Sequence, residues 1–164
     1  MDIPAGNALP NPYGGAGQPA YPWRGEITCH PAAGQAGSVD KSAAAGTQAA
    51  AFFGSAAAGQ FSSAGDVVSF SGAADWGYRR FALHYAKLAQ TAGGVDGFLI
   101  GSELRGVTRI RSSTDSFPAV SELVSLAGAV RSIIGTAPKL TYGADWSEYF
   151  GYRPADASGD VFFN

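Results

Sequence analysis

The sequence predicts an α/β domain in which parallel strands alternate with helices. Residues 96–102 and 139–144 read as strands that end in polar clusters, and helical patterns at 75–92 and 116–134 precede them. This order, with short turns, is typical of β/α units with parallel strands and right-handed crossovers. Because an eight-fold barrel takes about 250 residues, we expect the 164 residues to form a partial (β/α)8 TIM barrel, a fragment of one larger domain.

Composition excludes several classes of function. With 11 basic and 13 acidic residues, the net charge is -2, so no basic surface is expected for nucleic acid or an anionic membrane. The single cysteine, Cys29, excludes an internal disulfide and offers no metal cluster. No apolar run approaches the roughly 20 residues that cross a bilayer, and no secretion signal is visible. We therefore expect no membrane span, no metal and no cofactor.

The first 37 residues are rich in proline and glycine and predict a long loop. A loop of this length inside a domain is usually either functional or disordered. Its rigid, amphipathic rings, Tyr13, Tyr21 and Trp23, favour an ordered loop packed against another part of the molecule. Within it, residues 26–29 resemble a short strand.

A helix is expected next, over residues 39–53, with Ser38 as its N-cap and Gly54 at its end. The stretch that follows, 55–74, is rich in Gly, Ser and Ala, and residues 67–70 are a candidate hairpin strand. Loop, helix and hairpin together form an expected insertion at about residues 6–74.

The next two helices have apolar residues at spacings of three and four, which predict their buried faces. Asp75 is the expected cap of the first helix, and Gly93 ends it. The second begins near residues 116–118 and ends at Gly135. The predicted stripes are Tyr78, Phe81, Tyr85, Leu88 and Ala92 in the first helix, and Val120, Leu123, Ala127, Val130 and Ile134 in the second.

The strand at 96–102 contains three consecutive apolar residues, which suits a strand covered on both faces. Ligand sites of α/β folds gather at the carboxyl ends of such strands. Ser102 and Glu103 fall at that end. The strand at 139–144 ends in a second polar and aromatic cluster, which parallel pairing would bring to the same rim: Asp145, Trp146, Glu148 and Tyr149.

Five runs in a fixed order along the chain resemble the TIM-barrel-like domain of gene transfer agent and phage tail baseplate proteins. They are DIPAGN (2–7), YPWRGEITC (21–29), WGYRRF (76–81), GVDGFLIGSELRG (94–106) and LTYGADWSEYFG (140–151). The GSEL and YGADWSEY strand ends are also locally similar to a family of retaining β-mannanases in the clan of barrel glycosidases.

This resemblance implies positions on the barrel and roles for residues. Residues 1–5 would end the third strand, 96–102 would be the fourth and 139–144 the fifth. In that clan a Glu at the end of the fourth strand is the general acid/base, which matches Glu103, and the nucleophile ends the seventh strand, beyond this chain. Ser102 stands where the clan commonly has an Asn that contacts the sugar 2-hydroxyl.

The implied function is a glycoside hydrolase-like domain of a phage-type tail tip protein that hydrolyses or engages cell-surface glycan. The implied enzyme is a retaining O-glycosyl hydrolase, and the implied partners are cell-surface polysaccharide and other tail or baseplate proteins. The protein would be made in the bacterial cytoplasm and reside in the particle tail. The implied substrate-binding residues are Ser102, Asp145, Trp146, Glu148, Tyr149 and Trp23. The alternative is a non-catalytic barrel that binds glycan or only supports the baseplate.

Each candidate site also has a structural interpretation. Glu103 could be a strand-end carboxylate paired with Arg105 or Arg109, because ion-pair networks use the same residues as active sites. The rim cluster after residue 144 could simply cap the barrel. Cys29 and His30 are adjacent, so we expect a buried cysteine and a solvated histidine rather than a catalytic pair. His84 is expected to be a packed or surface residue.

Overall fold

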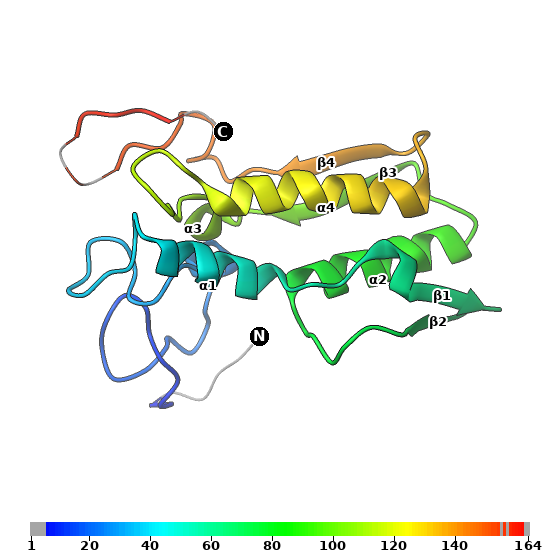
Figure 1. The fold of residues 1–164 in the computed structure, drawn as a ribbon, viewed down its shortest axis with the longest axis horizontal. Helices are drawn as coiled ribbons and strands as arrows, with labels where there is room; N and C mark the ends of the chain where they lie inside the picture. The colour runs from blue at the N-terminus through cyan, green and yellow to red at the C-terminus, as the bar shows by residue number, and fades with distance from the viewer. Residues whose placement is uncertain (1–5, 155, 157, 163–164) are drawn as a thin grey trace. The chain divides into compact units, whose positions relative to one another are not determined.

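The computed structural model describes residues 6–154, 156 and 158–162. Residues 1–5, which were predicted to end a barrel strand, lie outside this range. Figure 1 labels the α-helices and the strands. In chain order the elements are η1 Arg24–Glu26, α1 Ala43–Phe53, η2 Ala58–Gln60, β1 Phe61–Ala64, β2 Val67–Phe70, α2 Tyr78–Thr91, β3 Gly97–Ser102, α3 Arg105–Thr108, α4 Pro118–Ile134 and β4 Lys139–Gly143.

The chain divides into two compact units. The first unit comprises Met1–Ala49, Glu103–Val120 and Ala144–Asn164, and the second comprises Ala50–Ser102 and Ser121–Gly143. The second unit therefore contains both sheets, whereas the first contains η1 and α3.

Strands β3 and β4 pair in parallel, as predicted. Their register runs from Gly97 opposite Lys139 to Ser102 opposite Gly143, with an irregularity after Leu99. Such a parallel pair requires a crossover connection, and α4 lies between the two strands in the chain. The described residues thus form a mixed α/β structure with small sheets, which is consistent with part of a TIM barrel, and they contain no closed barrel.

Burial of β3 on both faces was predicted and is wrong for the described chain. Ile100 is buried, but Leu99 is 59% exposed, and Thr141, its partner in β4, is exposed too. Successive side chains point to opposite faces of a strand. One face of the β3–β4 pair is therefore covered and the other is open.

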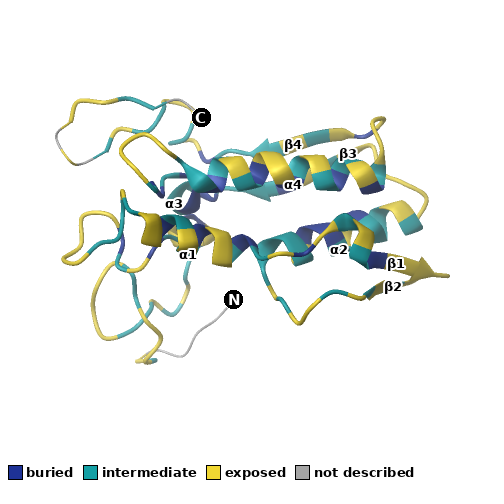
Figure 2. Cartoon of the chain, viewed as in Figure 1, coloured by how far each residue is buried: buried dark blue, intermediate teal, exposed yellow. Residues whose placement is uncertain are grey.

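Helix α2 also differs from its prediction. It begins at Tyr78 with Gly77 as N-cap, and Asp75 instead accepts a hydrogen bond from the Gly77 N–H at 2.7 Å. Most of its residues are partly buried (Figure 2). The buried face is Ala82, Leu83 and Ala86, whereas the predicted Phe81 and Tyr85 are 59% and 52% exposed. Small alanines permit close packing, so this helix buries the face adjacent to its aromatic stripe.

The other predicted elements of the second unit are mostly confirmed. Residues 67–70 form β2, which pairs antiparallel with β1. Helix α4 buries Leu123 and Val130 as predicted, but Leu126 and Ile133 in place of Ala127 and Ile134. The helix ends predicted at Gly54, Gly93 and Gly135 are confirmed by positive φ angles of 73°, 97° and 78°.

The N-terminal segment of the first unit is held by its own polar side chains. Asn7 Nδ2 donates to the Gln18 carbonyl at 2.8 Å, and Tyr13 OH donates to the Glu26 carbonyl at 3.0 Å. The strand predicted at 26–29 is wrong, because the turn η1 occupies its start. Helix α1 begins at Ala43 rather than residue 39, and Ser38 Oγ accepts from the Asp40 N–H at 3.2 Å instead of capping the helix.

Buried side chains of the first unit pack around Cys29. Cys29, Ala45, Ala49 and Ile110 form one cluster, against which Val39 packs. Gly25 is buried beneath the ring of Trp23, since a Cβ there would lie 2.4 Å from that ring. This packing sets the position of η1 and of the residues that flank it.

Candidate functional site

Glu103 directly follows β3 and has a left-handed backbone, with φ of 53°. This conformation costs a non-glycine residue about 1–2 kcal/mol. Such strain persists only where the surrounding structure enforces it, and it is concentrated at functional sites. The geometry of Glu103 thus marks the strand end that the sequence singled out.

Two donors from the N-terminal segment hold the Glu103 carboxylate. Oε2 accepts a hydrogen bond from Trp23 Nε1 at 3.2 Å and another from Arg24 Nη2 at 2.6 Å. The side chains of Arg24 and Glu103 are 51% and 36% exposed, so this ion pair remains open to solvent. The predicted pairing with Arg105 or Arg109 is wrong, because Arg24 takes that place. Only the resemblance of residues 21–29 to a known motif hinted at Arg24.

The carboxylates after β4 turn inward and brace the loop. Glu148 Oε2 accepts the Asp145 N–H at 2.7 Å, and Glu148 Oε1 accepts Thr108 Oγ1 at 3.1 Å. Asp145 is buried and accepts the Ser147 N–H at 3.0 Å. The hydroxyl of Ser147 lowers the pKa of Asp145 despite burial, which acts in the opposite direction. These bonds suit a structural loop cap as well as a binding site.

The aromatic residues of the same loop point the other way. Trp146 and Tyr149 are each 73% exposed, and Phe150 is 75% exposed. Exposed rings that gather in one short segment are characteristic of interaction sites rather than of packing. Phe150 was not singled out from the sequence, although it immediately follows Tyr149. Ser102, also predicted to bind substrate, is partly buried at the end of β3 opposite Gly143.

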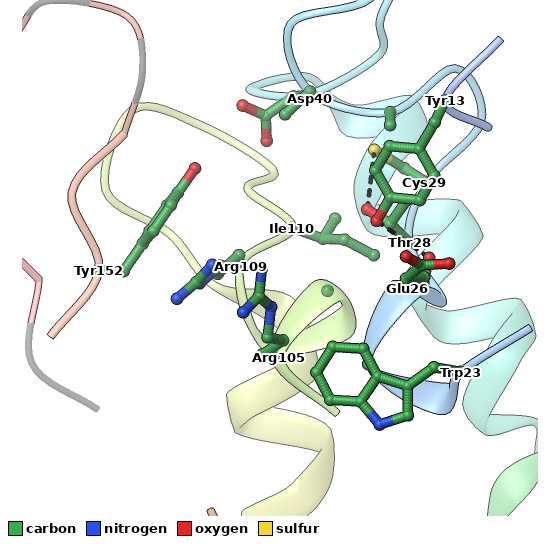
Figure 3. A pocket seen from close by; sticks show the side chains of 14 residues that line it. Tyr13, Trp23, Glu26, Thr28, Cys29, Asp40, Arg105, Arg109, Ile110 and Tyr152 are labelled. Carbon is green, nitrogen blue, oxygen red and sulfur yellow. Dashed lines mark hydrogen bonds between the residues drawn. The ribbon is translucent and has the colours of Figure 1, made fainter. Parts of the chain in front are cut away.

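A cavity of about 270 Å³ lies in the first unit (Figure 3). Trp23, which bonds Glu103, forms part of its wall. Arg105 and Arg109 also line it. Tyr152 lies on the side of Arg109 that faces away from Trp23 (Figure 3). Sequence reasoning missed this cavity because its lining comes from three separate segments.

Cys29 lies at the edge of this cavity and is 1% exposed. Burial raises the pKa of its thiol, which leaves it in the unreactive neutral form. His30 is exposed. The predicted buried cysteine and solvated histidine are therefore confirmed.

The described residues contain no group of three or more His, Cys, Asp or Glu side chains that could hold a metal ion. None of the helices in the part of the chain that the structure describes is both long and apolar enough to span a bilayer.

Comparison with protein families gives a match. The model of the family described as GTA TIM-barrel-like domain matches residues 76–164, which is more than half of the chain. The matched region includes Glu103 and the loop after β4 but not Trp23. No curated protein matches the chain.

Proposed function

This chain belongs to the GTA TIM-barrel-like domain family, and from that premise we propose that it is a glycosidase-like domain of a phage-type tail protein. In this proposal it hydrolyses cell-surface glycan with Glu103 as general acid/base, within a particle tail that contains other baseplate proteins. The observation that carries the proposal is the strained strand-end Glu103, whose carboxylate is oriented by Trp23 and Arg24.

The hydrogen bonds define a role for each carboxyl oxygen. Both bonds from the described residues go to Oε2, so Oε1 is the atom that exchanges a proton with the glycosidic oxygen. General acid catalysis requires the donor group to be held within hydrogen-bond reach of the atom it protonates. Orientation by an indole N–H and a guanidinium supplies that positioning.

Retaining hydrolysis also needs a second carboxylate, about 5–5.5 Å from the first. Asp145 and Glu148 are committed to the loop that they brace, so we assign neither as nucleophile. In this proposal the nucleophile lies on a later barrel strand, as the resemblance to barrel glycosidases implies. In this proposal the exposed rings of Trp146 and Tyr149 stack on sugar faces, while Ser102 contacts the sugar 2-hydroxyl.

A second candidate function is glycan binding without hydrolysis. The ion pair between Arg24 and Glu103 favours it, because a carboxylate that serves a structural role is commonly paired in this way. The exposed aromatic loop would serve this function equally well.

The test is Glu103→Gln in the full-length protein, which keeps the shape but removes the transferable proton. Turnover of an unactivated glycan should fall by about 10² to 10⁴, whereas an aryl glycoside with a good leaving group should lose less in the glycosylation step. Glycan binding should survive. Glu122→Gln, a carboxylate of α4 that is 34% exposed, is the matched control and should change neither rate.

Equal losses of turnover on both substrates, together with a lower melting temperature, would contradict the assignment of Glu103 as acid/base. Unchanged hydrolysis would do the same. Binding without hydrolysis by the wild-type protein would favour the second candidate.

A further inference from the structure

The cavity in the first unit has two arginines on one side. Arg105 and Arg109 are four residues apart, at the start and just beyond the end of α3. Like charges at this spacing repel one another on a helix. In Figure 3 both guanidinium groups lie between Tyr152 and Trp23. The cavity therefore concentrates positive charge between two aromatic rings.

Arg109 has only neutral partners within the described chain. Its Nη2 donates weakly to the Ser147 carbonyl at 3.4 Å and to Ser147 Oγ at 3.5 Å, and its guanidinium lies 5.0 Å from the Tyr152 ring centroid. By contrast, Arg24, Arg105 and Arg111 each form an ion pair. Arg109 is partly buried, so its charge is desolvated without direct compensation.

The electrostatic surroundings of Arg109 support the same view. Burial is the largest effect that lowers its pKa, and the neighbouring charge of Arg105 adds to it. Tyr152, Glu148 and Asp145 act in the opposite direction and raise the pKa, which offsets part of this effect. An anion placed between the two arginines would counter the repulsion between them and favour the charged form of Arg109.

Two acidic residues also line the cavity, and neither supplies that anion. Asp40 is paired with Arg111 at 2.7 Å. Glu26 is exposed, so solvent and salt screen its charge. Neither carboxylate of the lining therefore pairs with Arg109, whereas Arg105 is paired with Asp145 outside the lining.

Size and shape suit a single ring. The volume of about 270 Å³ is just below the roughly 300 Å³ of the smallest pockets for drug-sized ligands. Tyr13, Trp23 and Tyr152 provide flat apolar walls, and an arginine fork matches a carboxylate or a phosphate in two parallel bonds.

We propose that this cavity binds one anionic sugar residue, whose carboxylate or phosphate is held by Arg109 with Arg105 beside it. Trp23 lines the cavity and also donates a hydrogen bond to Glu103. The anionic sugar residue therefore occupies a subsite next to the proposed acid/base. The identity of the ligand as a glycan rests on the proposed function.

Calorimetric titration of the full-length protein tests this proposal with three probes. They are a galacturonic acid tetrasaccharide, the same tetrasaccharide with its carboxyl groups reduced to alcohols, and mannose 6-phosphate. One anionic probe should bind at least about 10-fold more tightly than the neutral one, the usual order for a charge-assisted hydrogen bond, and added salt should narrow the difference. Which anionic probe binds identifies the carboxylate or the phosphate as the ligand group.

Arg109→Gln should abolish the preference for the anionic probe, and Arg109→Lys should restore only part of it. Arg153→Gln is the matched control, because it removes an exposed positive charge one residue from Tyr152 and outside the cavity lining. The preference should survive it. Circular dichroism verifies that each variant is folded.

The proposal is overturned if neither anionic probe binds more tightly than the neutral one, or if Arg109→Gln leaves the preference intact. Its failure is distinguishable from that of the proposed function. If the protein prefers the anionic probe through Arg109 but hydrolyses no glycan, the proposed enzyme activity is contradicted and the anionic subsite is supported. If hydrolysis depends on Glu103 but Arg109→Gln has no effect on binding, the enzyme activity is supported and the anionic subsite is contradicted.

Discussion

Arg111 and Asp40 form a buried ion pair, with Arg111 Nη2 2.7 Å from Asp40 Oδ2 and the side chains 3% and 8% exposed. The Arg111 N–H donates to the other carboxylate oxygen at 3.0 Å. Burial alone would lower the pKa of Arg111, but the hydrogen bonds and charge of Asp40, together with a hydrogen bond to Asp156, outweigh burial and raise it. The pair joins positions 71 residues apart and so fastens the N-terminal segment to the chain after α3.

Breaking this pair should destabilise the first unit. Asp40→Asn removes the more buried of the two carboxylates that pair with Arg111, while Asp156 remains 3.1 Å from Arg111 Nη1, so the free energy of unfolding should fall by about 1.5–3 kcal/mol, the usual worth of a hydrogen bond to a charged group. Urea titration measures the change. The exposed pair provides the control, because Arg24→Gln should cost less than about 1 kcal/mol. Similar losses in the two variants would show that burial does not strengthen the dependence on Asp40.

Gly106 allows α3 to lie directly on η1. A Cβ at this position would be 2.5 Å from the Ile27 carbonyl oxygen and 2.7 Å from that of Gly25. Gly106→Ala should therefore lower stability by about 1–3 kcal/mol, the usual cost of overpacking. Gly128→Ala in α4 is the control, because nothing lies within 4 Å of its Cβ position, and it should raise stability by about 0.5–1 kcal/mol. Thermal melting of both variants measures these changes. If Gly106→Ala raises stability, α3 does not approach η1 as closely as described.

Asp75 should make stability depend on pH in the acid range. The N–H groups of Ser55 and Gly77 lower the pKa of its carboxyl, which therefore binds protons more weakly in the folded chain than in the unfolded one. Its contribution is complete above the ordinary carboxyl pKa of about 4 and disappears as the pH falls toward the lower folded value.

Asp75→Asn should consequently reduce the loss of stability between pH 5 and about pH 2. Urea midpoints across that range provide the measurement. Ser55→Ala removes the hydroxyl donor, which bonds Asp75 at 2.9 Å, but keeps the stronger backbone donor. It should therefore reduce the pH dependence of stability less than Asp75→Asn does. A profile unaffected by Asp75→Asn would disprove this role.

Backbone strain at Glu103 predicts an unusual order of stabilities. Asn adopts left-handed φ more readily than Glu, and β-branched residues adopt it worst. Glu103→Asn relieves strain but loses the exposed ion pair with Arg24 and the hydrogen bond from Trp23, so the opposing effects should leave stability within about 1 kcal/mol of the native value. Glu103→Val should cost about 2 kcal/mol or more. Equal destabilisation by Asn and Val would mean that side-chain contacts, not backbone conformation, control this position.

Large apolar side chains of the second unit are exposed, including Trp76 at 85%, Phe81 at 59% and Leu99 at 59%. A sheet of two strands also leaves unpaired edges. We expect residues 1–164, expressed alone, to bind the dye ANS and to unfold without a sharp transition. A monomer that melts cooperatively and binds no dye would show that these surfaces need no cover.

The sequence by itself determined the features that depend on neighbouring residues. Glycines at 54, 93 and 135 end their helices, because few other residues adopt left-handed φ. Parallel pairing of β3 and β4 followed from the order of strand, helix and strand. The end of the strand at Glu103 was also located from neighbouring residues, because the apolar run gives way to polar residues there.

Only the tertiary structure decided which faces are covered and which side chains meet. The aromatic stripe of α2 had the periodicity of a buried face, yet the adjacent alanine face is the one that packs, because burial depends on the surface opposite. Trp23 and Arg24 reach Glu103 across 80 and 79 positions. The cavity around Arg109 draws its walls from three segments. Such contacts form when distant parts of the chain pack together, and no local pattern encodes them.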